Sequence, residues 1–159
     1  MKKFFALALV LVSLFSCAAM AEAVELVPVT FEDGFQISLP GDWLELELDE
    51  ETMAQGIFYA ACSPDGANTV QISWSGLDAA MTIEEVQADL ATAYPDAQIA
   101  ELNGIAFVGF TDTANDLFGF VALDAAEPGL YTFWFTPASD ADFLTTASYI
   151  VASICNVEI

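Results

Sequence analysis

After Lys3 the chain contains no lysine, arginine or histidine, and this absence constrains the fold more than any other feature of the sequence. The chain has 159 residues, of which 24 are aspartate or glutamate and only two, Lys2 and Lys3, are basic. A product that lacks these lysines can form no side-chain salt bridge, and its surface charges can only repel one another. Because 56% of the residues are hydrophobic, a packed core is expected in spite of the charge.

The same charge limits the partners of the protein. Nucleic acid is excluded as a natural ligand, because binding to phosphates depends on Lys or Arg side chains that release counterions. Anionic membrane surfaces are disfavoured for the same electrostatic reason. A cationic partner or divalent ions would be attracted.

The first residues have the pattern of a secretory signal peptide. Lys2 and Lys3 precede an apolar run from Phe4 to Phe15 that is broken only by Ser13, and small residues follow. The run is shorter than the roughly 20 apolar residues that span a bilayer as a helix. We therefore expect a signal peptide over residues 1–21, a secreted or extracytoplasmic protein, and no transmembrane segment after signal removal.

Two cleavage patterns overlap in this region. Ala19-Met20-Ala21 fits ordinary signal peptidase, with release between Ala21 and Glu22. Leu14-Phe15-Ser16-Cys17 resembles a bacterial lipoprotein box, which would leave a membrane-anchored lipoprotein with its lipid on Cys17. We favour release at Glu22, because Phe15 is bulky for such a box and no Gly/Ser-rich tether follows Cys17.

Residues 22–159 have the usual length of one domain. Two cysteines, Cys62 and Cys155, remain in this part of the chain. An even pair outside the cytoplasm favours a disulfide between them, and the alternative is two buried thiols.

The order of expected elements is strands, helix, strands, helix. Strands are expected at 29–31 and 35–39 as a hairpin, at 44–48, at 56–62, at 69–75, at 99–111 with a break at 103–104, at 117–123 and at 130–136. A helix is expected from Thr82, which forms a capping box with Glu85, to Pro95, and another from Ser139. This order predicts an α+β sandwich, with an antiparallel sheet of about six or seven strands packed with two helices.

The stretch "FQISLPGDW" (Phe35–Trp43), followed by this order of elements, resembles the PsbP-like superfamily over roughly Val27 to Asn156. That group includes the extrinsic photosystem subunit, Ran-binding Mog-type proteins and secreted bacterial proteins of unknown role. The resemblance implies an α/β sandwich fold and a binding or assembly role, without shared catalytic residues. The metal-binding histidines of the photosystem members have no counterpart here.

Most catalytic chemistry is excluded by composition. Without His and, after Lys3, without Lys, the chain has no Ser-His-Asp system, no imidazole zinc site and no Schiff-base lysine. A carboxylate pair such as Glu45 and Glu47 would be the remaining route, as in a small carboxylate-dependent hydrolase. Such a pair is more typical of a solvated strand face, and we assign no catalytic residue.

We expect no cofactor, with calcium as the one ion that suits the oxygen ligands of this chain. Asp112, Asn115 and Asp116 lie together in an expected hairpin turn and are the candidate ligands. The 12-residue EF-hand loop pattern is missing.

A ligand face is expected on the strand "YTFWF", which is apolar on both sides. If its second side is not closed by the N-terminal hairpin, Trp134, flanked on its own face by Thr132 and Thr136, is the candidate contact to an unknown protein or carbohydrate. The sequence therefore predicts a secreted or envelope-associated, non-catalytic binding or assembly module. The alternatives are the small hydrolase and an acidic protein that captures a cationic partner or calcium.

Overall fold

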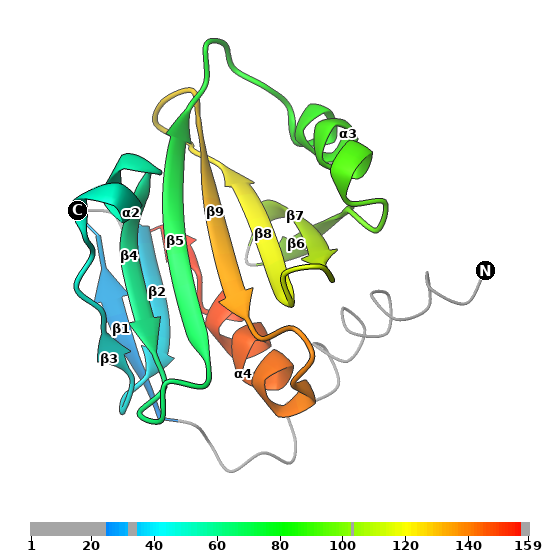
Figure 1. The fold of residues 1–159 in the computed structure, drawn as a ribbon. Helices are drawn as coiled ribbons and strands as arrows, with labels where there is room; N and C mark the ends of the chain where they lie inside the picture. The colour runs from blue at the N-terminus through cyan, green and yellow to red at the C-terminus, as the bar shows by residue number, and fades with distance from the viewer. Residues whose placement is uncertain (1–24, 32–34, 103, 157–159) are drawn as a thin grey trace. The chain divides into compact units, whose positions relative to one another are not determined.

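The structure, a computed structural model, describes residues 25–31, 35–102 and 104–156. The predicted signal peptide, with Cys17, Ala21 and Glu22, lies outside these residues. The chain divides into two compact units (Figure 1). The terminal unit comprises the described residues of Met1–Gly41 and Ala141–Ile159, and the central unit comprises Asp42–Asp140. The expectation of a single domain over 22–159 stays a prediction.

The terminal unit is a three-stranded antiparallel sheet with one helix. Its strands are β1 (Leu26–Thr30), β2 (Phe35–Pro40) and β10 (Cys155–Asn156), in the order β1-β2-β10, and its helix is α4 (Ala141–Ala152). The predicted hairpin is confirmed by the pairing of β1 with β2. The Ser153 hydroxyl accepts a 2.7 Å hydrogen bond from the amide of Ser38, which ties the end of α4 to β2.

The helix α4 packs against β2 through the apolar face that the sequence predicts. The expected residues of this face are all buried in the structure: Phe143, Ala147, Ile150, Val151 and Ile154. From β2, the alternate residues Phe35, Ile37 and Leu39 are buried as well. The helix begins at Ala141, two residues later than expected.

The central unit contains a seven-stranded antiparallel sheet with the order β3-β4-β5-β9-β8-β7-β6 (Figure 1). Its strands are β3 (Leu44–Glu45), β4 (Ile57–Cys62), β5 (Thr69–Gly76), β6 (Gln98–Leu102), β7 (Ile105–Asp112), β8 (Leu117–Leu123) and β9 (Gly129–Thr136). Its helices are α2 (Glu50–Ala54) and α3 (Ile83–Ala93). The predicted α+β class, with an antiparallel sheet of six or seven strands and packed helices, is confirmed.

One face of this sheet is dominated by phenylalanines. Phe118 lies opposite Phe135 and Phe120 lies opposite Phe133 on the paired strands β8 and β9. All four side chains are buried, and the rings of Phe118 and Phe120 meet edge to face at 4.5 Å between centroids. Phe107 of β7 continues the cluster, with edge-on contacts to Phe120 and Phe133. Aromatic pairs of this kind contribute beyond the burial of their area.

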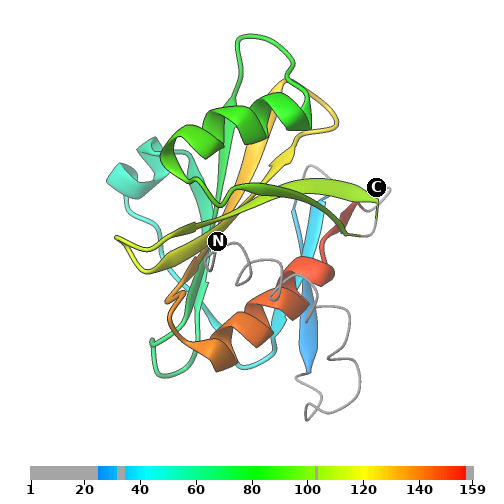
Figure 2. The same ribbon diagram turned by 90° about the vertical axis from the view of Figure 1, so that its right-hand side faces the viewer.

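The helix α3 lies across the opposite face of the sheet (Figure 2). Its start is the predicted capping box, in which the Thr82 hydroxyl accepts from the amide of Glu85 and the Glu85 carboxylate accepts from the amide of Thr82. Val86 is its buried residue and packs in a core cluster with Val108, Phe110 and Val121. The helix therefore lies over β6 and β7 on this face.

The segment "LELEL" (residues 44–48) is the main departure from the expected elements. Only Leu44 and Glu45 form a strand, and the chain then enters the short helix α2, which is not among the elements expected from the sequence. Asp49 is the N-cap of this helix and accepts from the amide of Thr52. The expected half-buried strand is wrong here, since Leu44 and Leu46 are 57% and 38% exposed.

Candidate functional site

The predicted ligand residues lie on the same face of the central sheet as α3. In the pairing of β5 with β9, Trp134 lies opposite Gln71, Thr132 opposite Ser73, and Thr136 opposite Thr69. Directly opposite residues in antiparallel strands point to the same side of the sheet. We call these six residues, Thr69, Gln71, Ser73, Thr132, Trp134 and Thr136, the tryptophan face.

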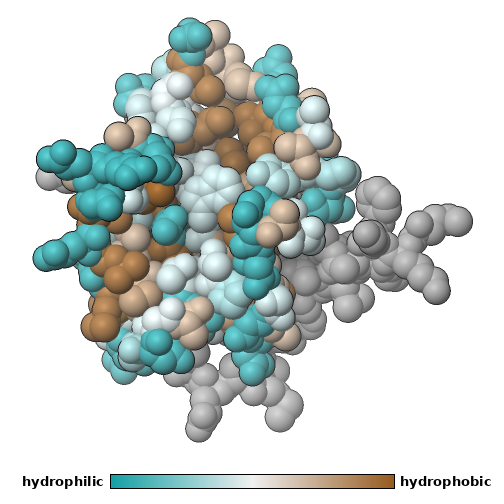
Figure 3. Space-filling view, in the orientation of Figure 1, coloured by the Kyte–Doolittle hydropathy of each residue, from teal (hydrophilic) through white to brown (hydrophobic). Residues whose placement is uncertain are grey.

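The tryptophan face is uncharged and partly accessible to solvent. Ser73 is buried, and the other five side chains are half-buried. Figure 3 shows this side of the central unit, with weakly polar side chains gathered over the middle of the sheet between more hydrophilic groups. In a chain with 24 acidic residues, an accessible row without a carboxylate is a distinct surface.

The indole of Trp134 is held from two sides. Its Nε1 donates to the hydroxyl of Ser73 at 3.4 Å, and its ring meets the ring of Phe110 edge-on at 5.6 Å between centroids. Phe110 is itself fully buried and stacks on Tyr94, which ends α3, at 4.4 Å. The candidate ligand residue is thus positioned by the helix-covered core beside it.

A glycine makes this arrangement possible. Gly119 of β8 lies between Trp134 and Phe110 in the sheet register. A Cβ atom at this position would lie 2.3 Å from Cζ of Phe110, so the aromatic ring occupies the space above the glycine. Gly119 is the reason why Phe110 can reach the edge of the indole.

The sequence identified three of the six residues of the face. Gln71 and Ser73 were expected to share one side of their strand, with Val70, Ile72 and Trp74 on the other side. The register of β5 with β9 confirms this alternation. Nothing local in the sequence links β5 to β9, because α3 and three strands lie between them in the chain.

The candidate calcium ligands have roles in the turn between β7 and β8. The Asp112 carboxylate accepts from the amides of Ala114 and Asn115 and, at 2.7 Å, from the Asn115 side chain. Asp116, at a φ of 54°, accepts from the amide and the hydroxyl of Ser139, both at 2.8 Å. Over the described ranges, no three His, Cys, Asp or Glu side chains are grouped as metal ligands would be. The calcium site stays a prediction.

Local hydrogen bonds and burial shift the pKa of a few ionisable groups. The pKa of Asp112 is lowered mainly by the Asn115 side chain, that of Asp65 mainly by the Ser63 hydroxyl, and that of Asp49 mainly by Thr52. Burial raises the pKa of Tyr59, and the nearby charge of Glu45 adds to this effect. These carboxylates belong to turns and a helix cap, which gives their shifts a structural cause.

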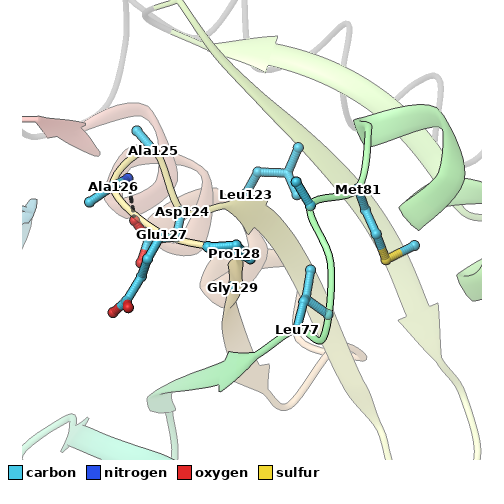
Figure 4. A pocket seen from close by; sticks show the side chains of 10 residues that line it. Leu77, Met81, Leu123, Asp124, Ala125, Ala126, Glu127, Pro128 and Gly129 are labelled. Atoms are coloured by element: carbon cyan, nitrogen blue, oxygen red, sulfur yellow. Dashed lines mark hydrogen bonds between the residues drawn. The ribbon is translucent and has the colours of Figure 1, made fainter.

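A shallow, open pocket of about 230 Å³ lies between the turn that joins β8 to β9 and the segment before α3 (Figure 4). Leu77, Met81 and Leu123 contribute its apolar wall. Asp124 in this turn accepts from Nε1 of Trp74 at 2.9 Å and from the amide of Ala126, and the Glu127 side chain extends away from Met81. Asp124 and Glu127 are the acidic residues that line this pocket, and the hydrolase alternative stays a prediction.

The two cysteines are free thiols in the structure, with Cys62 buried and Cys155 half-buried. The expected disulfide is thus not formed there, and Cys62 lies in the central unit while Cys155 lies in the terminal unit. The pairing stays a prediction for the mature protein.

The sequence matches no protein-family model and no curated protein. Among solved structures, a chain from Bacteroides thetaiotaomicron VPI-5482, known from a crystal structure at 1.50 Å resolution, is similar in fold. The TM-score is 0.55 with 14% sequence identity, over 82% of this chain and 48% of that one. The chain thus spans about half the length of that protein, and the likeness concerns the fold alone. No helix among the described residues is both long and apolar enough to cross a membrane.

Proposed function

We propose that this chain is a secreted or envelope-associated, non-catalytic binding module of the PsbP-like type, and that the tryptophan face holds an uncharged polar ligand. The observation that supports this proposal is the composition of the tryptophan face. Six uncharged side chains, one of them a half-buried tryptophan, are lined up on neighbouring strands of a strongly acidic chain.

The chemistry of the face favours a carbohydrate over other uncharged ligands. An indole offers a flat apolar surface with a polar tip, and Thr, Ser and Gln side chains donate and accept hydrogen bonds to hydroxyl groups. Because Trp134 already contacts Ser73 and Phe110, little side-chain freedom is lost on binding. An anionic ligand would be repelled by the acidic surface around it.

The PsbP-like assignment is supported by the sequence and the element order. The stretch that carries the resemblance begins with β2, and the chain continues through sheet strands, a helix, a meander of strands and a closing helix. The assignment implies a binding or assembly role and transfers no site residue to this chain.

Replacing Trp134 with alanine is expected to weaken ligand binding by about tenfold or more, since a central tryptophan often dominates an interface. The probes are cellohexaose, chitohexaose, maltohexaose and xylohexaose, titrated by isothermal calorimetry and by tryptophan fluorescence. Trp134→Phe keeps an aromatic ring beside Phe110 and should retain part of the affinity.

Trp74→Phe is the matched control, because Trp74 lies on the opposite face of the same sheet and is also half-buried. Its affinity for the same sugar should stay close to that of the unmodified protein. Binding that is equal in the Trp134→Ala protein, or no binding of any of the four sugars, would contradict the carbohydrate proposal.

The mature form of the protein can be read from its intact mass. We expect the secreted chain to begin at Glu22 and to have lost two hydrogens through a bond between Cys62 and Cys155. A chain that begins at Cys17 with added lipid mass would instead show a membrane-anchored lipoprotein. A mass that equals the full thiol form would contradict the disulfide.

A further inference from the structure

The edge strand β3 and the residue that follows it carry apolar side chains that the central unit does not cover. Leu44 is 57% exposed and Leu46 is 38% exposed. Among the residues that the structure describes, six large apolar side chains are more than a third exposed, and four of them lie between residues 44 and 58. The four are Leu44, Leu46, Met53 and Phe58. We call residues 44–47 the leucine edge.

The sequence of the leucine edge is that of a strand with one buried face. Alternation with a period of two is the pattern that a half-buried strand requires. In the structure only Leu44 and Glu45 form a strand, and all four residues of the leucine edge are exposed. The pattern therefore fits a strand whose covering element is not part of the described chain.

The backbone of the leucine edge is placed for further pairing. β3 is the outermost strand, and β4 is its neighbour in the sheet. Leu44 lies opposite Cys62, and the amide of Leu46 donates to the carbonyl of Ala60 at 2.9 Å. In an antiparallel ladder the intervening residue, Glu45, directs its amide and carbonyl away from β4. An added strand would pair on that outer side.

Charge selects the kind of strand that can be added. Glu45 and Glu47 alternate with the leucines, and Asp49, Glu50 and Glu51 follow directly. A second copy of this edge would place carboxylates beside carboxylates, which disfavours self-pairing. A segment in which Lys or Arg alternates with apolar residues would place opposite charges together and cover the leucines.

We propose that the leucine edge is a docking site for an extended, cationic segment of another protein, which adds a strand to the sheet beside β3. The occupant alternates apolar residues with Lys or Arg. Leu44 lies on the same side of the sheet as the tryptophan face, because Cys62 is opposite both Leu44 and Thr69. The two sites are distinct because β4 lies between β3 and β5 in the strand order.

The test uses acetyl-LKLKLK-amide as the probe and acetyl-LLLKKK-amide as a control with the same composition and charge. Fluorescently labelled peptides are titrated against the protein by anisotropy at physiological salt. We expect the alternating peptide to bind about tenfold or more tightly than the block peptide, because only it can match the strand in register. Amide hydrogen exchange at Glu45 and Glu47 should slow in its presence.

One double variant tests the leucines of the leucine edge, and a second tests its glutamates. Leu44→Ser with Leu46→Ser should weaken binding of the alternating peptide about tenfold, since the leucines are exposed in the free protein and covered in the complex. Glu45→Lys with Glu47→Lys should abolish this binding and produce binding of acetyl-LELELE-amide. Ile99→Ser, at a 39% exposed position on the opposite edge strand β6, should not change the binding of either peptide. Trp134→Ala should also leave peptide binding unchanged.

Equal affinity for the two lysine peptides would overturn the proposal and show attraction by net charge alone. Unchanged exchange at Glu45 and Glu47 in a saturated complex would also overturn it, because strand addition must protect the outward amide of Glu45. Because the charge-reversal variant is tested by a gain of binding, loss of folding cannot imitate its expected result.

Discussion

Replacing Gly119 with alanine is expected to lower the free energy of unfolding by about 1–3 kcal/mol, the usual cost of overpacking a core. The new methyl carbon would lie 2.3 Å from Cζ of Phe110 and 2.6 Å from its Cε1. The ring cannot move away easily, because it is fully buried, stacks on Tyr94 and meets Trp134. Urea unfolding, followed by circular dichroism, measures the change.

Gly109→Ala is the matched control for this substitution. It also lies in a central strand of the same sheet, and its added carbon would come no closer than 3.3 Å to the ring of Phe120. We expect Gly109→Ala to lower the free energy of unfolding by clearly less than Gly119→Ala does. Phe110→Leu shortens the side chain above Gly119, so the double variant should be more stable than the sum of the two single effects predicts. Simple additivity, or an effect as small as that of Gly109→Ala, would contradict the proposed contact.

Gly119→Ala should also affect Trp134 in the tryptophan face. Phe110 contacts the edge of the indole, and a ring displaced by the new methyl group would press on Trp134. The comparison of Gly119→Ala with Gly109→Ala therefore also shows whether the helix-covered core positions the candidate ligand residue.

Much of the fold could be predicted because its signals are local. The capping box of Thr82 and Glu85 fixes the start of α3, and the alternation in residues 69–75 gives the facing of β5 before any partner is known. The pairing of β5 with β9 could not be predicted in this way. It joins segments about 60 residues apart, and only the assembled sheet brings Gln71 beside Trp134.

The region around β3 shows where local signals compete. The alternation in residues 44–48 favours a strand, while Asp49 with Glu50 and Glu51 has the features of a helix N-terminus. The helix signal limits the strand to Leu44 and Glu45 and leaves the leucines exposed. Periodicity predicted the facing of these side chains but could not show whether anything covers them.

Added salt is expected to raise the melting temperature of the mature protein by about 5–10 °C, because like charges on its surface are screened. The experiment compares about 10 mM with about 1 M sodium chloride, over which the Debye length falls from about 30 Å to about 3 Å. After Lys3 every charged side chain is acidic, so no favourable side-chain ion pair is weakened by the same screening. The melting temperature is measured by differential scanning calorimetry.

Calcium distinguishes screening from a specific site. If the acidic surface only needs screening, calcium and magnesium chloride at equal ionic strength should raise the melting temperature equally, and Asp116→Asn should not change their difference. A larger effect of calcium that Asp116→Asn removes would support the predicted site at Asp112, Asn115 and Asp116. Sodium chloride is used in preference to sulfate, because sulfate also strengthens apolar burial. A melting temperature that does not change with sodium chloride would mean that the spacing of the carboxylates already relieves their repulsion. The negative charge would then restrict which partners the protein can bind without lowering its stability.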